Sequence, residues 1–268
     1  MIISKKHNFT FIHIPKCAGT TVRTVLSEFN EWKHSGPPWV KNHSYCGLMD
    51  FGHIPLFTLR DHFKNDFEAI KASWSFAVVR DPHERFASSV SQRLKMYNEN
   101  SIYSLSTKDF ERVIKKDIEF LINQPKTENL LPAEYIHFQK QSDYLKIEGE
   151  MLVDSIYTTG NLSELFEEIE KITGKKLSYR SDKSQDVRKE GETRVIKRDS
   201  LIWLVKAGKM FGLNKIISSN IKQRILGPIS TPRDQRLKSL FMEPYVKNFI
   251  SDYYQDDIEI YKSATQKK

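Results

Sequence analysis

A lysine and a glycine stand between a predicted strand and a predicted helix near the start of the chain. Asn8–Ile14 is a run of β-branched and aromatic residues, typical of a strand that is buried on both faces. After Pro15 the loop carries Lys16 and Gly19, and a helical pattern begins at Thr20. Backbone N–H groups at a helix N-terminus have no partner within the helix and attract anions together with the helix dipole. Because Lys16 adds a charge and Gly19 permits close backbone approach, the loop fits a phosphate-binding loop, but taken alone it fits a basic turn with a solvated Lys16 equally well.

This loop differs from the Walker A motif of nucleotide hydrolases. The GxxxxGK[ST] pattern is absent because Lys16 precedes Gly19, and Cys17 stands where the Mg²⁺-binding Ser or Thr would follow the lysine. A Mg-ATP enzyme such as a P-loop kinase is therefore disfavoured, but it stays an alternative. A thiol beside a lysine could be activated. Since no partner residues for cysteine chemistry are evident, Cys17 is interpreted as loop packing.

A second strand–loop–helix unit carries an arginine and a serine. Trp74–Arg80 is the predicted strand, Asp81 is a good N-cap for the helix that follows, and Glu84 would close a capping box. Arg80 ends the strand, and Ser88 lies two turns into the helix. If the two strands are neighbours in a parallel sheet, both loops open at its carboxyl edge, where such folds bind ligands. The two units then form one cleft with two anion sites.

The remaining predicted elements alternate between strands and helices. Helices are expected over 107–123 and 161–173 and from Pro244 to Tyr254, with a strand over Met151–Tyr157. Alternation of this kind favours an α/β fold, a parallel sheet flanked by helices.

One polar, basic stretch does not follow this alternation. Residues 180–231 are expected to form a helical and loop insertion in the C-terminal third, and Thr231-Pro232 is expected to open another helix. The whole of 1–268 is predicted to be a single domain that contains this insertion.

The composition excludes several classes of protein. Lys+Arg 42 against Asp+Glu 34 gives a net charge of +8, and 39% hydrophobic residues exclude global disorder. No apolar run approaches the roughly 20 residues of a membrane span. Two cysteines and eight scattered histidines form no metal motif, so no metal is expected. The positive charge indicates an anionic partner, with nucleic acid, lipid, polysaccharide and a multi-phosphate cofactor all open.

Three segments of the chain carry a resemblance to a known family. His13–Thr21 (HIPKCAGTT) resembles the 5′-phosphosulfate loop of the carbohydrate sulfotransferases related to heparan sulfate 2-O-sulfotransferase. Phe76–Ser89 resembles their 3′-phosphate motif, including the spacing from Arg80 to Ser88, and Phe51–Pro55 (FGHIP) resembles the segment that supplies their catalytic histidine. Weaker similarity extends over Gln141–Leu145, Met151–Gly174 and Tyr253–Tyr261.

The resemblance implies a P-loop-type α/β fold and a sulfotransferase that moves a sulfuryl group to a carbohydrate hydroxyl. The implied donor is 3′-phosphoadenosine 5′-phosphosulfate (PAPS), and the product is adenosine 3′,5′-bisphosphate (PAP). In the matching positions, Arg80 and Ser88 would hold the 3′-phosphate, with Arg85 nearby. The 5′-phosphate would be held by the backbone amides of Lys16, Cys17, Ala18, Gly19, Thr20 and Thr21. Because the sulfuryl group carries less negative charge than a phosphoryl group, no metal is required.

The resemblance assigns His53 as the catalytic base that takes the proton of the acceptor hydroxyl. An imidazole with a pKa near 6.5 is mostly free to accept a proton at neutral pH. Without the resemblance, a hydrogen-bonded turn histidine would be the favoured interpretation of His53. Lys16 is placed to stabilise charge on the leaving phosphate. His137 is a weaker candidate for contact with the acceptor, and His13 is interpreted as structural.

The partners of the protein remain open on several points. The basic stretch 197–224 could contact a membrane surface or a polyanion, or be a solvated helical face, so the acceptor glycan could be acidic or lipid-linked. A non-catalytic polyanion-binding module is a further alternative, although no nucleic-acid-binding signature is present. No leader is recognised, so the expected localisation is cytoplasmic, with a trimmed Golgi-lumenal domain as the alternative.

Overall fold

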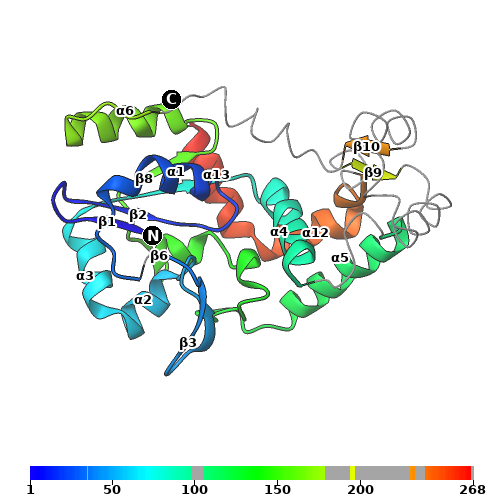
Figure 1. Cartoon of the computed structure of the whole chain (residues 1–268). Helices are drawn as coiled ribbons and strands as arrows, with labels where there is room; N and C mark the ends of the chain where they lie inside the picture. Colours follow the sequence, from blue (N-terminus) through cyan, green and yellow to red (C-terminus); the bar gives the residue numbers. More distant parts are fainter. Residues whose placement is uncertain (35, 98–104, 179–193, 197–229, 233–238, 267–268) are drawn as a thin grey trace, which may run out of the picture. The chain divides into compact units, whose positions relative to one another are not determined.

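The computed structural model describes residues 1–34, 36–97, 105–178, 194–196, 230–232 and 239–266 (Figure 1). The chain divides into two compact units. The first comprises Met1–Ser89, Pro125–Ser184 and Ile250–Lys268, and the second comprises Val90–Gln124 and Gln185–Phe249. Most of the predicted insertion over 180–231 lies outside the described residues.

The first unit is built on a four-stranded sheet with the order β1-β2-β5-β8. Its strands are β1 (Ile2–Ser4), β2 (Phe9–Ile12), β5 (Trp74–Val79) and β8 (Ser155–Thr158). β1 is antiparallel to β2, whereas β2, β5 and β8 are parallel, with Phe11 opposite Phe76 and Val78 opposite Tyr157. The two strands that precede the predicted anion loops are therefore direct neighbours, and both loops lie at the same edge of the sheet.

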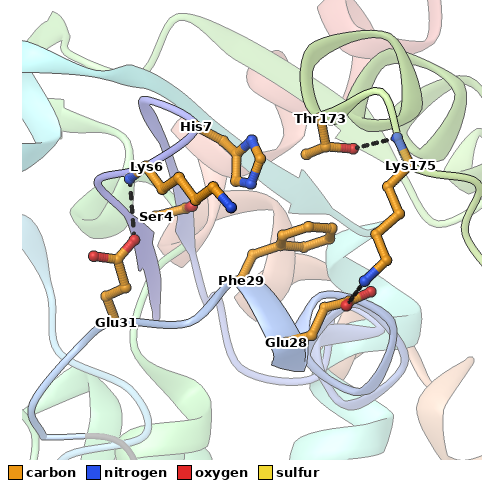
Figure 2. Close-up of a pocket in the computed structure, with 8 residues that line it drawn as sticks. All are labelled: Ser4, Lys6, His7, Glu28, Phe29, Glu31, Thr173 and Lys175. Atoms are coloured by element: carbon orange, nitrogen blue, oxygen red, sulfur yellow. Dashed lines mark hydrogen bonds and ion pairs between the residues drawn. The ribbon is translucent and has the colours of Figure 1, made fainter.

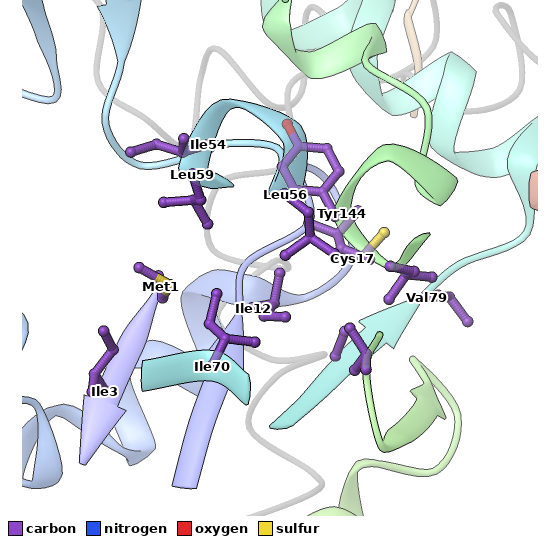
Figure 3. Packing of buried hydrophobic residues seen from close by; sticks show 14 of the residues in the cluster. Met1, Ile3, Ile12, Cys17, Ile54, Leu56, Leu59, Ile70, Val79 and Tyr144 are labelled. Carbon is purple, nitrogen blue, oxygen red and sulfur yellow. The ribbon is translucent and has the colours of Figure 1, made fainter. Parts of the chain in front are cut away.

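Helices cover both faces of this sheet. Because side chains alternate along a strand, β2 and β5 present different residues to each face. One face packs against α1 (Gly19–Val25), the 3₁₀ helix η1 (Ser27–Phe29) and α6 (Leu162–Thr173). The other packs against α2 (Leu56–His62), α3 (Lys64–Ala72) and α13 (Gln255–Gln266), as Figure 3 shows for Ile12, Leu56 and Ile70. This arrangement confirms the predicted mixed α/β fold with helices flanking a largely parallel sheet.

Shorter elements complete the first unit. A hairpin of β3 (Val40–His43) and β4 (Gly47–Asp50) precedes α2, and the 3₁₀ helices η3 (Ile136–Phe138) and η4 (Ser142–Tyr144) precede the hairpin of β6 (Lys146–Ile147) and β7 (Glu150–Met151). The predicted strand over Met151–Tyr157 was wrong at its start. Met151 belongs to β7, and the strand of the central sheet begins at Ser155.

The helix after β5, α4 (Pro82–Tyr97), begins as the sequence predicts. The Asp81 Oδ1 accepts from the backbone N–H groups of His83 (2.9 Å) and Glu84 (3.0 Å), which confirms the N-cap. The Glu84 carboxylate, which the sequence assigns to a capping box, is instead bonded to the guanidinium of Arg80.

The second unit contains the predicted helix α5 (Thr107–Ile122), which is closed at its start by a capping box between Ser106 and Asp109. The helix α12 (Pro244–Tyr253) also begins where predicted. The predicted helix at Thr231-Pro232 was wrong, because these residues belong to β10 (Ser230–Pro232), which pairs with β9 (Arg194–Ile196). Proline is accepted both in a first helical turn and at an edge strand, so this signal does not discriminate between the two. Among the described helices, none is long and apolar enough to cross a membrane.

Candidate active site

The loop between β2 and α1 presents an uncapped helix start. Lys16 and Ala18 have left-handed backbone conformations, with φ of 63° and 58°, and no side chain caps the helix at Ala18. Such conformations are costly for residues other than glycine and are often found at functional sites. Because no side chain occupies the first amides of α1, they can accept an anion.

Cys17 anchors this loop in the core. Its side chain is 1% exposed, and its thiol donates to the Pro15 carbonyl oxygen (3.4 Å) and to the Gln141 Oε1 (3.2 Å). Burial raises the pKa of the Cys17 thiol to about 12. The thiol is therefore protonated and inaccessible, as expected for loop packing rather than nucleophilic chemistry.

Three histidines lie in a row beside the loop. The ring centroids of His13 and His53 are 4.3 Å apart, and those of His53 and His137 are 5.3 Å apart. His13 directly follows β2, His53 lies in the turn before α2, and His137 lies in η3. Gly19 has no side chain where the His13 ring lies, because a Cβ at Gly19 would overlap the Nε2 and Cδ2 atoms of that ring. His13 is thus a buried structural residue, as predicted, and its ring packs against that of His53.

The turn that carries His53 is fixed by Asp50. The Asp50 Oδ1 accepts from the Gly52 N–H (2.7 Å), and the Asp50 carbonyl oxygen accepts from the His53 N–H (3.1 Å). The His53 Nδ1 lies 3.3 Å from the carbonyl oxygen of His13. Since a carbonyl can only accept, Nδ1 carries the proton, and Nε2 of the neutral ring keeps the lone pair that can take a proton.

Burial and neighbouring charge keep these imidazoles neutral. The pKa of His53 is well below its ordinary value, mainly because of burial and then because of His137 and Lys16. Burial, followed by Lys16 and Arg85, lowers the pKa of His137 to about 4. Lys16 contributes to both shifts, so its ammonium group lies within electrostatic range of His53 and His137.

Asp50 is a site residue that the sequence analysis missed. One carboxylate oxygen of Asp50 and one ring nitrogen each of His53 and His137 lie within 4.8 Å of one another. A carboxylate near an imidazole favours the protonated form of that imidazole. The same three groups are also ligand types for a transition-metal ion, so the absence of a metal requirement stays a prediction. The sequence signal was Asp50-Phe-Gly-His53, a side-chain–backbone turn directly before the histidine.

The second predicted anion loop begins at Arg80, directly after β5. The Arg80 guanidinium is 23% exposed and forms an ion pair with Glu84 (2.9 Å), which is 64% exposed. Ser88 is half-buried one turn beyond Glu84 on α4. The structure joins Arg80 to the first loop through Gln141, whose Oε1 accepts from both the Arg80 N–H and the Cys17 thiol.

Arg85 does not belong to the predicted anion site. It is 1% exposed, and its guanidinium donates to the His137 carbonyl oxygen (3.2 Å) and to the Asp257 carboxylate (3.4 Å). A buried arginine needs a buried partner, and Asp257 on α13, far along the chain, supplies it. The His137 carbonyl oxygen also accepts from the Ser89 hydroxyl (2.6 Å), so Arg85 and Ser89 position His137 instead of binding a ligand.

A cavity of about 440 Å³ lies at the opposite, amino end of β2 (Figure 2). It is lined by Ser4, Lys6, His7, Glu28, Phe29, Glu31, Thr173 and Lys175. Lys175 is paired with Glu28 across it, and Glu31 accepts from the Lys6 backbone N–H (3.0 Å). None of the predicted site residues lines this cavity.

A neutral histidine, an uncapped helix start and an arginine thus lie at one edge of the parallel sheet. The family model of the sulfotransferase family matches residues 1–263. The chain therefore belongs to the sulfotransferase family, and it is a sulfotransferase. Membership implies in general a PAPS donor, a PAP product and an acceptor substrate. Neither the search of curated proteins nor the search of solved structures finds a match.

Proposed function

We propose that this sulfotransferase moves the sulfuryl group of PAPS to a carbohydrate hydroxyl, with His53 as the general base. The observation that carries the proposal is the neutral His53, whose Nδ1 is committed to the His13 carbonyl oxygen beside Lys16. The resemblance of His13–Thr21 and Phe51–Pro55 to segments of carbohydrate sulfotransferases supports the acceptor class. Family membership favours sulfuryl transfer over the kinase and polyanion-binding alternatives.

Two anion sites fit a donor with two phosphate positions. The amides of Lys16–Thr21 would hold the 5′-phosphate, since α1 starts without a side-chain cap. Arg80 and Ser88 would hold the 3′-phosphate. The ion pair of Arg80 with the exposed Glu84 is of a kind worth at most about 1 kcal/mol. A phosphate can therefore compete for the guanidinium through stronger, bidentate hydrogen bonds.

The residues at this edge divide the chemistry between them. When bound, PAPS supplies the sulfuryl group, and its 5′-phosphate is the leaving group. The His53 Nε2 accepts the proton of the acceptor hydroxyl as that oxygen forms its bond to sulfur. The ammonium group of Lys16 stabilises the charge that develops on the leaving oxygen. The Asp50 carboxylate then stabilises the imidazolium of His53.

The donor assignment is tested by the binding of adenosine 3′,5′-bisphosphate. At a hundred times its dissociation constant, a ligand of the native state stabilises it by about 2.7 kcal/mol. For a chain of this size, such a stabilisation raises the Tm by roughly 5 to 10 °C. Absence of a shift at millimolar ligand would refute the donor assignment.

The base assignment is tested separately with His53→Asn. This variant should keep the Tm shift with adenosine 3′,5′-bisphosphate and lose transfer by roughly 10²- to 10⁴-fold, the usual contribution of a general base. His62→Asn, at an exposed position on α2, is the matched control and should keep both. Full transfer activity of His53→Asn would remove His53 as the base. Transfer of ³⁵S from labelled donor, measured over a panel of glycans and small alcohols, tests the acceptor class.

A further inference from the structure

The side-chain amide of Gln141 bridges the two predicted phosphate loops. Its Oε1 accepts from the Arg80 backbone N–H (2.9 Å) and from the Cys17 thiol (3.2 Å), and its Nε2 donates to the Arg80 carbonyl oxygen (3.0 Å). Gln141 is completely buried. One side chain therefore satisfies both backbone groups of Arg80, the residue directly after β5, and also bonds to Cys17, which is the only buried residue among Lys16, Cys17 and Ala18.

Gln141 is itself fixed from the other side by α13. The Asp257 Oδ2 accepts from the Gln141 N–H (2.8 Å), and the Asp257 Oδ1 accepts from the Ser142 N–H (2.9 Å). Asp257 is completely buried and is paired with Arg85. Asp257 therefore holds Gln141 in place, and the Gln141 side-chain amide in turn fixes the positions of Cys17 and Arg80.

This placement has a consequence for ligands that contact both loops. Two contacts of one ligand reinforce each other only when the two subsites are held at the spacing of the ligand's own groups. If only the pairing of β2 with β5 joined the two loops, residues beyond the strand ends could move and change the spacing between the loops. The Gln141 amide restricts this movement, because it contacts both loops directly after β2 and β5.

We infer that Gln141 is a positioning residue that sets the spacing between the 5′-phosphate and 3′-phosphate subsites. It touches neither phosphate and acts through the backbone of Arg80 and the thiol of Cys17. The inference rests on the proposed two-phosphate donor. Its signature is the gain in affinity that a nucleotide obtains from a second phosphate, not the affinity for either phosphate alone.

The test compares three nucleotides on the full chain by titration calorimetry. These are adenosine 3′,5′-bisphosphate, adenosine 5′-monophosphate and adenosine 3′-monophosphate. In Gln141→Leu, the gain from the second phosphate should fall about tenfold, which corresponds to 1.4 kcal/mol, while the affinity for each monophosphate changes little. Gln141→Met, unbranched and of similar length, is the second variant should Gln141→Leu fail to fold. Cys17→Ala, which removes the thiol's contact with Gln141 together with its bond to the Pro15 carbonyl oxygen, should show the same effect to a smaller degree.

Gln139 supplies a matched control two residues away. It is also buried (3% exposed) and makes three side-chain hydrogen bonds, accepting from the Leu131 N–H (2.9 Å) and donating to the Asn129 carbonyl oxygen (3.0 Å) and the Asp143 carboxylate (2.6 Å). These bonds involve neither phosphate loop. Gln139→Leu should therefore lose stability as Gln141→Leu does, but keep the wild-type gain from the second phosphate.

The possible results distinguish a failure of the positioning role of Gln141 from a failure of the donor assignment. An unchanged gain in the Gln141 variants, or an equal loss for all three nucleotides, would overturn the positioning role and leave the donor assignment intact. A wild-type protein that binds the bisphosphate no better than a monophosphate would overturn the donor assignment, and the positioning role with it.

Discussion

Gly19→Ala is a sharp test of the packing beneath the phosphate loop, because two physical effects predict opposite signs. Gly19 is the first residue of α1, and alanine is favoured over glycine in helices by roughly 1 kcal/mol. Helix propensity alone therefore predicts stabilisation. The structure predicts the reverse, since a Cβ at this position would overlap the His13 ring at Nε2 and Cδ2 and lie 2.9 Å from Cε1.

The expected cost follows from the surroundings of the ring. His13 is 7% exposed and its ring lies against that of His53, so it has little room to move. Overpacking of a filled core usually costs about 1 to 3 kcal/mol, and this overlap with a rigid ring belongs at the upper end. For a chain of this size, a loss of about 3 kcal/mol lowers the Tm by roughly 6 to 12 °C. Urea unfolding and thermal unfolding both measure it.

The double variant isolates the cause. In a His13→Ala background, the overlap is gone, and Gly19→Ala should become neutral or slightly stabilising. The coupling energy between the two positions should therefore be about 2 kcal/mol or more, at the upper end of values for residues in contact. A stable Gly19→Ala single variant, or an equal loss in both backgrounds, would refute the proposed packing of His13 against the loop.

Three further predictions follow from the charged and ionisable groups. The folded-state pKa of His137, about 4, lies below the unfolded value of 6.5, so the stability contribution of this residue is full above about pH 6.5 and is lost as the pH falls towards 4. His137→Asn should therefore reduce the pH dependence of the free energy of unfolding, measured with urea, by about 3 kcal/mol. An unchanged pH dependence would contradict the buried neutral ring. Arg80→Ala should weaken the binding of adenosine 3′,5′-bisphosphate about tenfold or more. Glu84→Gln frees the Arg80 guanidinium and should bind the bisphosphate as tightly as the wild type or more tightly. Weaker binding by the Glu84 variant would argue against Arg80 as a phosphate ligand. At pH 8 a thiol reagent should modify Cys46 but not Cys17 in the native protein, and both in denaturant; rapid labelling of native Cys17 would contradict its burial.

The sequence was sufficient for the parts of the fold that local patterns encode. Asn8–Ile14 and Trp74–Arg80 are apolar runs bounded by proline or by a capping residue, and both form adjacent parallel strands. The start of α4 was predictable because Asp81 caps it. The strand over Met151–Tyr157 was placed too early because the apolar run from Met151 to Val153 continues the hairpin strand, although Asp154 at a bend separates it from the sheet strand.

The supports of the site could not be predicted because they depend on contacts between distant residues. Arg85 lies one turn before Ser88 and was expected at the anion site, yet Asp257, 172 positions along the chain, draws it into the core. Gln141 contacts Cys17 over 124 positions, and the weak family similarity of Gln141–Leu145 does not indicate that contact. Only Asp50 left a readable signal, because its turn lies directly before His53.

The ionisation state of the site is a property of the packing rather than of the motif. A motif can place a histidine near a lysine, but it cannot say that a half-buried imidazole lies between two buried ones, with Lys16 acting on two of the three. Burial and positive neighbours both disfavour the imidazolium, so His53 and His137 are neutral well below pH 6.5. In the proposed mechanism, the same Lys16 that weakens His53 as a base faces an anionic donor. Negative charge held by the loop therefore offsets the effect of Lys16 on His53, and the base becomes stronger when the sulfuryl group is in place.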